Sequence, residues 1–272
     1  MLGSIIGDIV GSIYEFHNIK TTDFPFFQEK MEYTDDSILT LATADWLMHG
    51  GQSGDYYLRY ALDNPDPMGS YGASFVHWVG RARQGDTRPY NSYGNGSAMR
   101  VGPVGWAGTT KEETLELARR SAECTHNHPE GIKGAQAVAL CIFLARTGST
   151  PTDIRQAVGD AFGYSLGLTV GELRARYSWD GIDGRGDGGS CQDSVPQAIT
   201  CALEAAGFED AMRAAISIGG DSDTIGCIAG SIAEALYGIP QALRDRAMTY
   251  LPPHFRKIVD TFESRFGCRI LP

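Results

Sequence analysis

The sequence lacks the features that mark several common protein classes. Its six cysteines include no Cys-x-x-Cys pair and no dense spacing, so a disulfide scaffold is not indicated and we expect free or buried thiols. The longest uninterrupted apolar run, residues 137–145, is about half of the roughly 20 residues that a helix needs to cross a bilayer. The apolar N-terminus has no basic leader and carries Asp8, unlike a secretory signal. We therefore expect a soluble, cytoplasmic protein without a membrane partner.

Positive charge is also scarce. Lys and Arg number 23 against 33 Asp and Glu, which gives a formal net charge of −10 at pH 7. A polyanion would meet a repulsive average field, which disfavours nonspecific binding of nucleic acid, although local donors or metal ions can still receive a small anionic ligand. The 272 residues, 42% of them hydrophobic, suffice to bury one substantial core, and we expect a single domain over residues 1–272.

Convincing alternation of β-branched residues is hard to find, whereas apolar spacing near 3.6 residues recurs along the chain. This pattern predicts an all-α fold. Thr110 and Glu113 fit a capping box, and Thr150 followed by Pro151 fits an N-cap with proline at the first helical position. Further helices are expected over residues 3–14, 36–49, 130–146, 193–206, 208–218, 224–237 and 254–265.

Glycines recur every four residues in two of these expected helices, at Gly3, Gly7 and Gly11 and again at Gly226 and Gly230. A glycine inside a helix costs roughly 1 kcal/mol relative to alanine, so a row of them on one face indicates close approach of another backbone. We favour a tight helix crossing over direct contact with a ligand.

The longest polar, glycine-rich interruption covers residues 178–192 (SWDGIDGRGDGGSCQ). Its polarity excludes it from a core. Loops of this length are either functional or simply flexible, so a mobile lid over a site and a solvated connection both fit.

The first acidic cluster consists of Thr34, Asp35 and Asp36, directly before the apolar segment ILTLATADWL. Adjacent carboxylates repel each other, so the pair requires solvent, the free N–H groups of a helix start, or cations. By itself the cluster fits an ordinary helix N-terminus, where hydroxyls and carboxylates satisfy those N–H groups.

A second acidic cluster changes this balance. Asp221, Asp223 and Thr224 again stand at a helix start, before the small-residue segment IGCIAGSIAEALYG. Together the two clusters offer an oxygen-only cage of the kind that Mg²⁺ or Mn²⁺ prefers, and two cations can share a bridging carboxylate. We therefore favour a dinuclear metal site over two unrelated helix caps.

A third segment, NSYGNGSAMR at residues 91–100, combines glycines with short polar residues before a helix-compatible stretch. This composition lets successive backbone N–H groups converge on an anion such as a diphosphate. Alone, the segment also fits an ordinary turn.

Taken in order, these motifs resemble those of the ADP-ribosylglycohydrolase family. The matching segments are GDIVGSIYE, YTDDS, SYGNGSAMR, the pair Thr125 and His126, and GGDSDT, with CQDSVPQAI similar to the helix that precedes the last cluster. The resemblance spans residues 3–238, and the combination is highly specific although no single motif is.

The resemblance implies a compact orthogonal all-α bundle with two divalent cations, Mg²⁺ or Mn²⁺, in a cleft. It also implies hydrolysis of the bond between the distal ribose C1″ and an acceptor. By motif position, one ion would be surrounded by Thr34, Asp35, Asp36 and Asp223, and the other by Asp221, Asp223 and Thr224. Glu15 falls where related enzymes place a mobile acidic residue near the metals.

The same resemblance assigns the diphosphate of ADP-ribose to the loop of Asn91, Ser92, Tyr93, Gly94, Asn95 and Gly96. His126 would lie close to the adenosine or diphosphate portion, and Tyr93 is the candidate for contacting adenosine. Some family members place an aspartate where this chain has Ser92, which puts a transfer of arginine-linkage specificity in doubt.

The resulting hypothesis gives Asp35 and Asp36 combined metal-binding and catalytic roles, and Glu15 a role in proton transfer or gating. The substrate would be an ADP-ribosylated protein or a small ADP-ribose conjugate, with ADP-ribose as product, and nucleic acid only as an ADP-ribosylated substrate. Arginine, serine, acetate, another ADP-ribose and a nucleic-acid end are all candidate acceptors. Two alternatives stay open: a non-catalytic ADP-ribose-binding or structural protein, and a two-metal phosphohydrolase.

Overall fold

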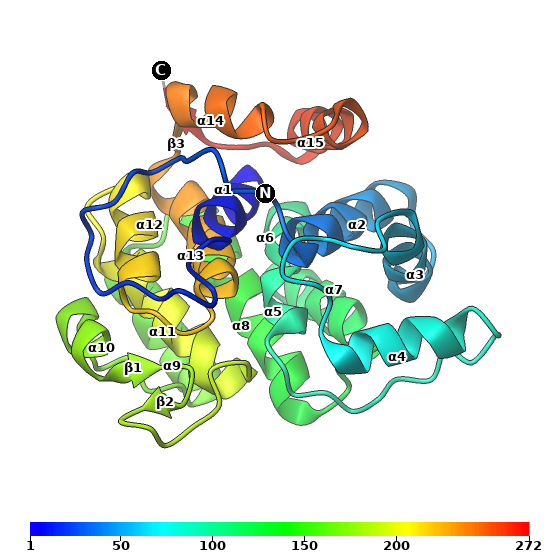
Figure 1. Cartoon of the computed structure of the whole chain (residues 1–272), viewed down its shortest axis with the longest axis horizontal. Coiled ribbons are helices and arrows are strands. Elements are labelled where there is room, and N and C mark those ends of the chain that lie inside the picture. The colour runs from blue at the N-terminus through cyan, green and yellow to red at the C-terminus, as the bar shows by residue number, and fades with distance from the viewer. Residues whose placement is uncertain (272) are drawn as a thin grey trace.

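The structure, a computed structural model, describes residues 1–271 and is built almost entirely from helices (Figure 1). The helices are α1 (Leu2–Gly11), α2 (Asp35–His49), α3 (Ser53–Asp63), α4 (Ala73–Ala82), α5 (Gly96–Met99), α6 (Gly102–Ala107), α7 (Lys111–Glu123), α8 (Pro129–Arg146), α9 (Pro151–Phe162), α10 (Val170–Arg176), α11 (Cys191–Glu204), α12 (Phe208–Ser217), α13 (Ser222–Tyr237), α14 (Gln241–Met248) and α15 (Pro253–Phe266). Strands β1 (Tyr177–Ser178) and β2 (Gly181–Ile182) form a short antiparallel hairpin, and β3 (Ile239–Pro240) pairs in parallel with β4 (Ile270–Leu271). The predicted all-α class is confirmed.

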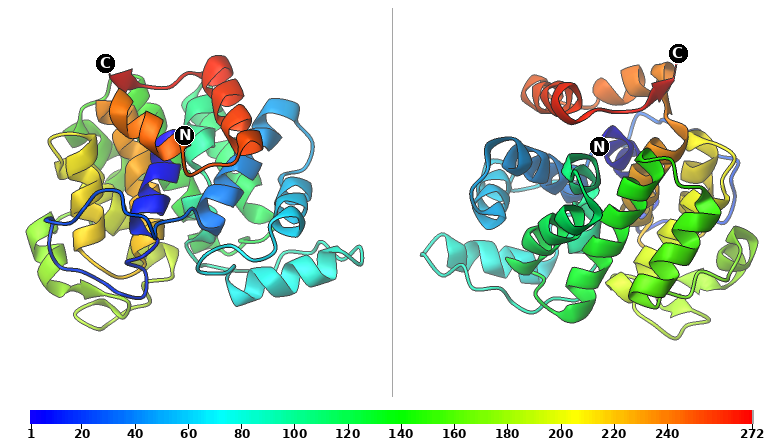
Figure 2. Two further views of the ribbon diagram at one scale, coloured as in Figure 1. Left: turned by 45° about the horizontal axis from the view of Figure 1, so that its top comes forward. Right: turned by 180° about the vertical axis from the view of Figure 1, so that it is seen from behind.

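The helices surround α1 and α13, which lie near the centre in Figure 1. Helices α14 and α15 cross the top of that view, while α4 and the β1–β2 hairpin lie on opposite sides of its lower half. A view turned by 45° and a view from behind agree on this arrangement (Figure 2). Within residues 1–271, no helix combines the length and apolar character that a bilayer crossing requires.

The glycine rows of α1 and α13 face each other and allow the two backbones to touch. A Cβ on Gly7 would lie 1.9 Å from the carbonyl oxygen of Gly226, and one on Gly3 would lie 2.2 Å from that of Gly230. A Cβ on Gly11 would lie 2.4 Å from the Cα of Asp223. The predicted tight helix crossing is therefore confirmed. At the Gly11 end of the crossing, α1 packs against Asp223 of the second acidic cluster.

Helix α1 is shorter than the expected 3–14, because it ends at Gly11. The Ser12 N–H still bonds to Asp8 O, but the Tyr14 N–H closes a tighter turn onto Gly11 O at 2.8 Å. The chain then leaves the helix, so Glu15 lies in the loop after α1 and not on the helix itself. The predicted N-cap at Thr110 is present, yet its capping box is not, since the Glu113 carboxylate accepts from Thr109 instead.

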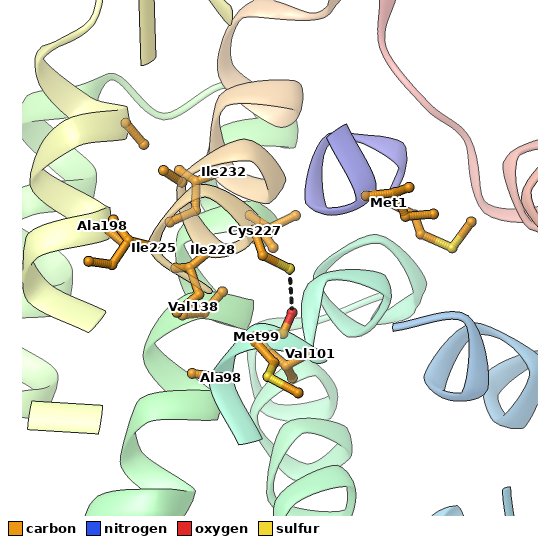
Figure 3. Close-up of a cluster of buried hydrophobic side chains, with 14 of the residues drawn as sticks. Met1, Ala98, Met99, Val101, Val138, Ala198, Ile225, Cys227, Ile228 and Ile232 are labelled. Carbon is orange, nitrogen blue, oxygen red and sulfur yellow. Dashed lines mark hydrogen bonds between the residues drawn. The ribbon is translucent and has the colours of Figure 1, made fainter. Parts of the chain in front are cut away.

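Helix α5 is fixed between the two helices that carry the acidic clusters. The Met99 carbonyl accepts hydrogen bonds from Cys227 Sγ of α13 at 3.2 Å and from Thr40 Oγ1 of α2 at 3.4 Å. Figure 3 shows the first of these bonds within an apolar cluster that includes Ile225 and Ile228. The C-terminal end of α5 therefore contacts both α2 and α13.

Candidate active site

A cavity of about 390 Å³ joins the three polar motifs. Its wall includes carboxylates of both acidic clusters, the glycine-rich loop and one histidine. The predicted site residues that line the cavity are Glu15, Asp35, Asp36, Asp221, Asp223, Thr224, Ser92, Gly94, Asn95, Gly96 and His126. Asn91, Tyr93 and Thr34 are absent from this wall, and their predicted contacts with ligand or metal stay predictions.

Each acidic cluster occupies a helix start, as the sequence indicates. Thr34 is the N-cap of α2, and its hydroxyl accepts from the Asp36 N–H at 3.2 Å, which leaves both carboxylates free of capping. Asp221 is the N-cap residue of α13 but makes no side-chain cap. Carboxylates of both clusters thus line the cavity. Asp223 Oδ1 accepts from the Thr224 N–H at 2.9 Å, and Asp221 Oδ2 accepts from Asn95 Nδ2.

Asp8 accepts hydrogen bonds from the turn that carries the first cluster. Sequence reasoning missed this residue. It is fully buried in α1, and its carboxylate accepts from Thr34 N at 2.9 Å, Thr34 Oγ1 at 2.7 Å, Ser37 N at 3.0 Å and the Ser37 hydroxyl. Burial raises its pKa to about 6, against the lowering effect of these bonds. A lone aspartate within an apolar helix was the available signal.

Glu15 joins the second cluster. One carboxylate oxygen each from Glu15, Asp221 and Asp223 lies within 4.8 Å of the others, a spacing that can hold a metal ion. The Glu15 side chain is also close to Gly69, where a Cβ would lie 2.9 Å from Oε2. Sequence reasoning expected proton transfer or gating from Glu15, and the geometry adds metal binding as a second possible role.

Burial and mutual repulsion disfavour the charged form of the carboxylates in the cavity. Burial, followed by the charges of neighbouring carboxylates, raises the pKa of Asp35, Asp36 and Asp223 well above the ordinary value. The same causes raise the pKa of Glu15 to about 8. Within residues 1–271, the buried Asp36 Oδ2 has no hydrogen-bond partner. This concentrated oxygen-only donor set fits hard divalent cations, whose charge would relieve the repulsion.

The glycine-rich loop is tied to both sides of the cavity by Asn95. Its Nδ2 donates to Asp221 Oδ2 at 2.7 Å, and its backbone N–H donates to Gly189 O at 2.9 Å. Tyr93 is 47% exposed and packs edge-on against His128 with ring centroids 5.5 Å apart, outside the cavity wall. The part of the loop that faces the cavity is therefore Ser92 and Gly94 to Gly96.

His126 closes the side of the cavity next to this loop. It is 6% exposed, and its Nδ1 lies 2.8 Å from the Thr125 hydroxyl. A Cβ built on Gly96 would lie 3.1 Å from His126 Nε2, so this nitrogen faces the glycine-rich loop. Burial and the charge of Arg100 lower the pKa of His126 well below its ordinary value, so the ring is neutral.

Part of the polar 178–192 segment also reaches the site. Trp179 Nε1 donates to Glu15 O at 2.9 Å, and the Trp179 ring stacks on Phe16 with an interplanar angle of 5°. Gly189 lines the cavity, and the Cys191 N–H donates to Tyr93 O at 2.9 Å. The segment therefore contacts both the Glu15 loop and the glycine-rich loop, while its predicted motion as a lid stays a prediction.

Sequence reasoning missed the wall formed by the end of the α3–α4 connection and the first turn of α4. Residues 69–75, including Tyr71 and Phe75, line the cavity beside Glu15, and so do Tyr90 and Arg100. The segment has no periodic pattern. Arg100 stood within the quoted SYGNGSAMR motif but had no assigned role.

Known proteins share both the sequence pattern and the fold. A model of the ADP-ribosylglycohydrolase family matches residues 1–266. The chain is 29% identical to ADP-ribosylhydrolase ARH3 of Homo sapiens, over 89% of this chain and 85% of that protein. It is 26% identical to ADP-ribosylarginine hydrolase Tri1 of Pseudomonas putida (strain GB-1), over 88% of this chain and 70% of that protein. A solved structure titled ADP-ribosylglycohydrolase-related protein complex superposes with a TM-score of 0.68 at 24% identity, covering 97% and 92% of the two chains, which concerns the fold alone.

Proposed function

The chain belongs to the ADP-ribosylglycohydrolase family and is a hydrolase of glycosyl bonds, and we propose that it uses divalent cations to cleave the ribosyl C1″ bond of ADP-ribosylated substrates. The observation that carries this proposal is the meeting of three motifs, distant in sequence, around one cavity. Two of these motifs supply carboxylates and the third is the glycine-rich loop. ADP-ribose would be the released product.

Two Mg²⁺ ions, or Mn²⁺ ions, would be held by Thr34, Asp35, Asp36, Asp221, Asp223 and Thr224. When bound, such ions polarise and orient hydroxyl groups and water. The oxygen-only donor set and the partnerless Asp36 Oδ2 support this assignment. Glu15, within 4.8 Å of oxygens of Asp221 and Asp223, can share an ion or relay a proton.

The protein's own groups account for the rest of the chemistry. Positive charge develops at C1″ and the ring oxygen as the glycosyl bond breaks, and the carboxylates of Asp35 and Asp36 stabilise that charge. A carboxylate beside the reacting centre accepts the proton of the attacking water. The 91–96 loop and His126 hold the diphosphate portion, which fixes C1″ against the carboxylates.

The chemical identity of the acceptor, the group to which ADP-ribose is linked, follows least directly from the cavity. The relatives named above include an ADP-ribosylarginine hydrolase, which makes an arginine-linked protein one candidate substrate. Ser92 stands where some family members carry aspartate, so a serine or other hydroxyl linkage is the second candidate. Both share the ADP-ribosyl group that the cavity would recognise.

A panel of ADP-ribosylated substrates, one each with an arginine, serine and acetyl linkage, tests the proposal in the presence of Mg²⁺. We expect ADP-ribose and the free acceptor from at least one linkage. Release of AMP would instead identify a phosphohydrolase. Binding without products from any linkage would identify a binding module.

A further inference from the structure

Arg100 is a fully buried guanidinium, and no carboxylate of residues 1–271 pairs with it. Its Nη2 donates to Ser121 O at 2.9 Å and to Thr125 Oγ1 at 2.8 Å. Its Cζ lies 4.0 Å from the centroid of the Tyr57 ring. Within residues 1–271, Nε and Nη1 have no hydrogen-bond partner. Burying a charge that is only partly compensated is costly. The one hydrogen bond that Arg100 makes to another side chain is the bond to Thr125 Oγ1.

The hydroxyl of Thr125, which accepts this hydrogen bond from Arg100, also contacts His126 in the cavity wall. Thr125 Oγ1 accepts from Arg100, since a guanidinium is only a donor, and it lies 2.8 Å from His126 Nδ1. The hydroxyl proton has two acceptors within reach, His126 Nδ1 and Ala122 O, and the second is 3.5 Å away. The shorter contact favours donation of this proton to His126 Nδ1.

Two further features keep the ring in this state. Burial and the nearby Arg100 charge lower the pKa of His126 well below its ordinary value, so the ring does not carry a second proton. The Tyr57 hydroxyl, 2.7 Å from Ser121 Oγ and 3.0 Å from Thr43 Oγ1, fixes the aromatic face on which Arg100 rests. A planar guanidinium stacks on that face and still donates, which lysine would not reproduce.

We propose that Arg100 and Thr125 are positioning residues that hold His126 as the neutral Nε2–H tautomer, so that the ring donates a hydrogen bond to an oxygen of the ligand on the 91–96 loop. The direction of Nε2 toward Gly96 supports this. The ligand group is an acceptor oxygen such as a diphosphate oxygen, and this part rests on the proposed function. Neither Arg100 nor Thr125 needs to touch the ligand.

Thr125 is the residue to change, because truncating the buried Arg100 would endanger folding. Thr125→Val keeps the side-chain shape and removes the hydroxyl, and Thr125→Ser restores it. Nitrogen-15 NMR of the metal-loaded wild type, with the His126 signals assigned from His126→Ala, should show a protonated Nε2 and an unprotonated Nδ1. Thr125→Val should change this pattern, and Thr125→Ser should recover it.

Calorimetry with ADP-ribose provides the second readout. We expect Thr125→Val to weaken binding about 10–100-fold, the range for a hydrogen bond to a charged group, with unchanged Mg²⁺ affinity. In a His126→Ala background, Thr125→Val should cause no further loss.

Three results would overturn the inference: a proton on His126 Nδ1 in the wild type, wild-type affinity in Thr125→Val, or an equal loss in the His126→Ala background. If the wild type fails to bind ADP-ribose, the proposed function fails. The His126 tautomer still decides the inference in that case.

Discussion

Asn95 Nδ2 donates a 2.7 Å hydrogen bond to Asp221 Oδ2, which joins the glycine-rich loop to the second acidic cluster. One side chain thus couples the proposed diphosphate site to the proposed metal site. Asn95 is buried, and its backbone N–H is held by Gly189 O, so the amide has little freedom to turn away.

Asn95→Ala should therefore weaken ADP-ribose and Mg²⁺ together. Loss of a hydrogen bond to a charged group corresponds to roughly 1.5–3 kcal/mol, or about 10-fold or more in affinity. Calorimetry with each ligand measures the effect. Asn64→Ala removes the same chemical group from a residue that does not line the cavity, and it keeps the backbone carbonyl that accepts from the Tyr71 hydroxyl, so it serves as the control. A loss of ADP-ribose affinity without any change in Mg²⁺ affinity would show that the two sites are independent.

Asp8 should prove essential to the shape of the first cluster without being a ligand. Asp8→Ala leaves the buried donors of Thr34 and Ser37 without an acceptor, which should lower the free energy of unfolding by about 1–3 kcal/mol or more. Urea denaturation measures this, with the exposed Asp55→Ala as a control that should change stability little. Unchanged stability in Asp8→Ala would mean that the 34–37 turn does not depend on α1.

The dependence of stability on pH should differ with and without metal. Burial raises the pKa of Asp8 to about 6 and that of Glu15 to about 8, above their unfolded values. The folded state therefore binds more protons, and stability without metal should fall as pH rises from about 4, near the unfolded pKa values, to about 8, the folded pKa of Glu15. With Mg²⁺ this fall should be reduced or reversed, because ions bind the deprotonated carboxylates. Thermal denaturation in EDTA and in excess Mg²⁺ checks this, and identical pH profiles would contradict it.

Glu15→Gln should separate metal binding from proton transfer. Because Glu15 lies within 4.8 Å of Asp221 and Asp223 oxygens, we expect weaker Mg²⁺ affinity and a rate that recovers substantially as Mg²⁺ is raised. The measurement is kcat across a Mg²⁺ titration, compared with calorimetric Mg²⁺ affinity. A loss of about 10²–10⁴-fold that excess Mg²⁺ does not restore would instead assign Glu15 to general acid–base catalysis.

Much of the fold and part of the cavity could be predicted from the sequence, because periodic or repeated patterns carried the information. The glycine rows predicted tight helix crossings, and the structure shows that the two rows cross each other. Two clusters before apolar helices predicted where carboxylates would gather. The signal in each case was several residues long.

The remaining parts depend on single residues whose partners are distant in sequence. Asp8 is one aspartate in an apolar helix, and its role appears only when Thr34 and Ser37 are folded against it. The role of Arg100 likewise depends on a contact that the sequence does not reveal, because its partner Thr125 lies 25 residues away. Tyr71 reaches the cavity from an irregular segment, where no period fixes the direction of a side chain.

The central claim is that both acidic clusters hold the cations on which hydrolysis depends. The direct test is the initial rate of ADP-ribose release by EDTA-treated protein after Mg²⁺ is returned, for the wild type, Asp35→Ala, Asp223→Ala and the exposed control Asp55→Ala. The wild type and control should lose activity in EDTA and recover it with Mg²⁺. Both cluster variants should stay largely inactive while remaining folded, since each removes a carboxylate that repels its neighbours without metal. Full activity in either cluster variant, or an EDTA-insensitive wild type, would contradict the account.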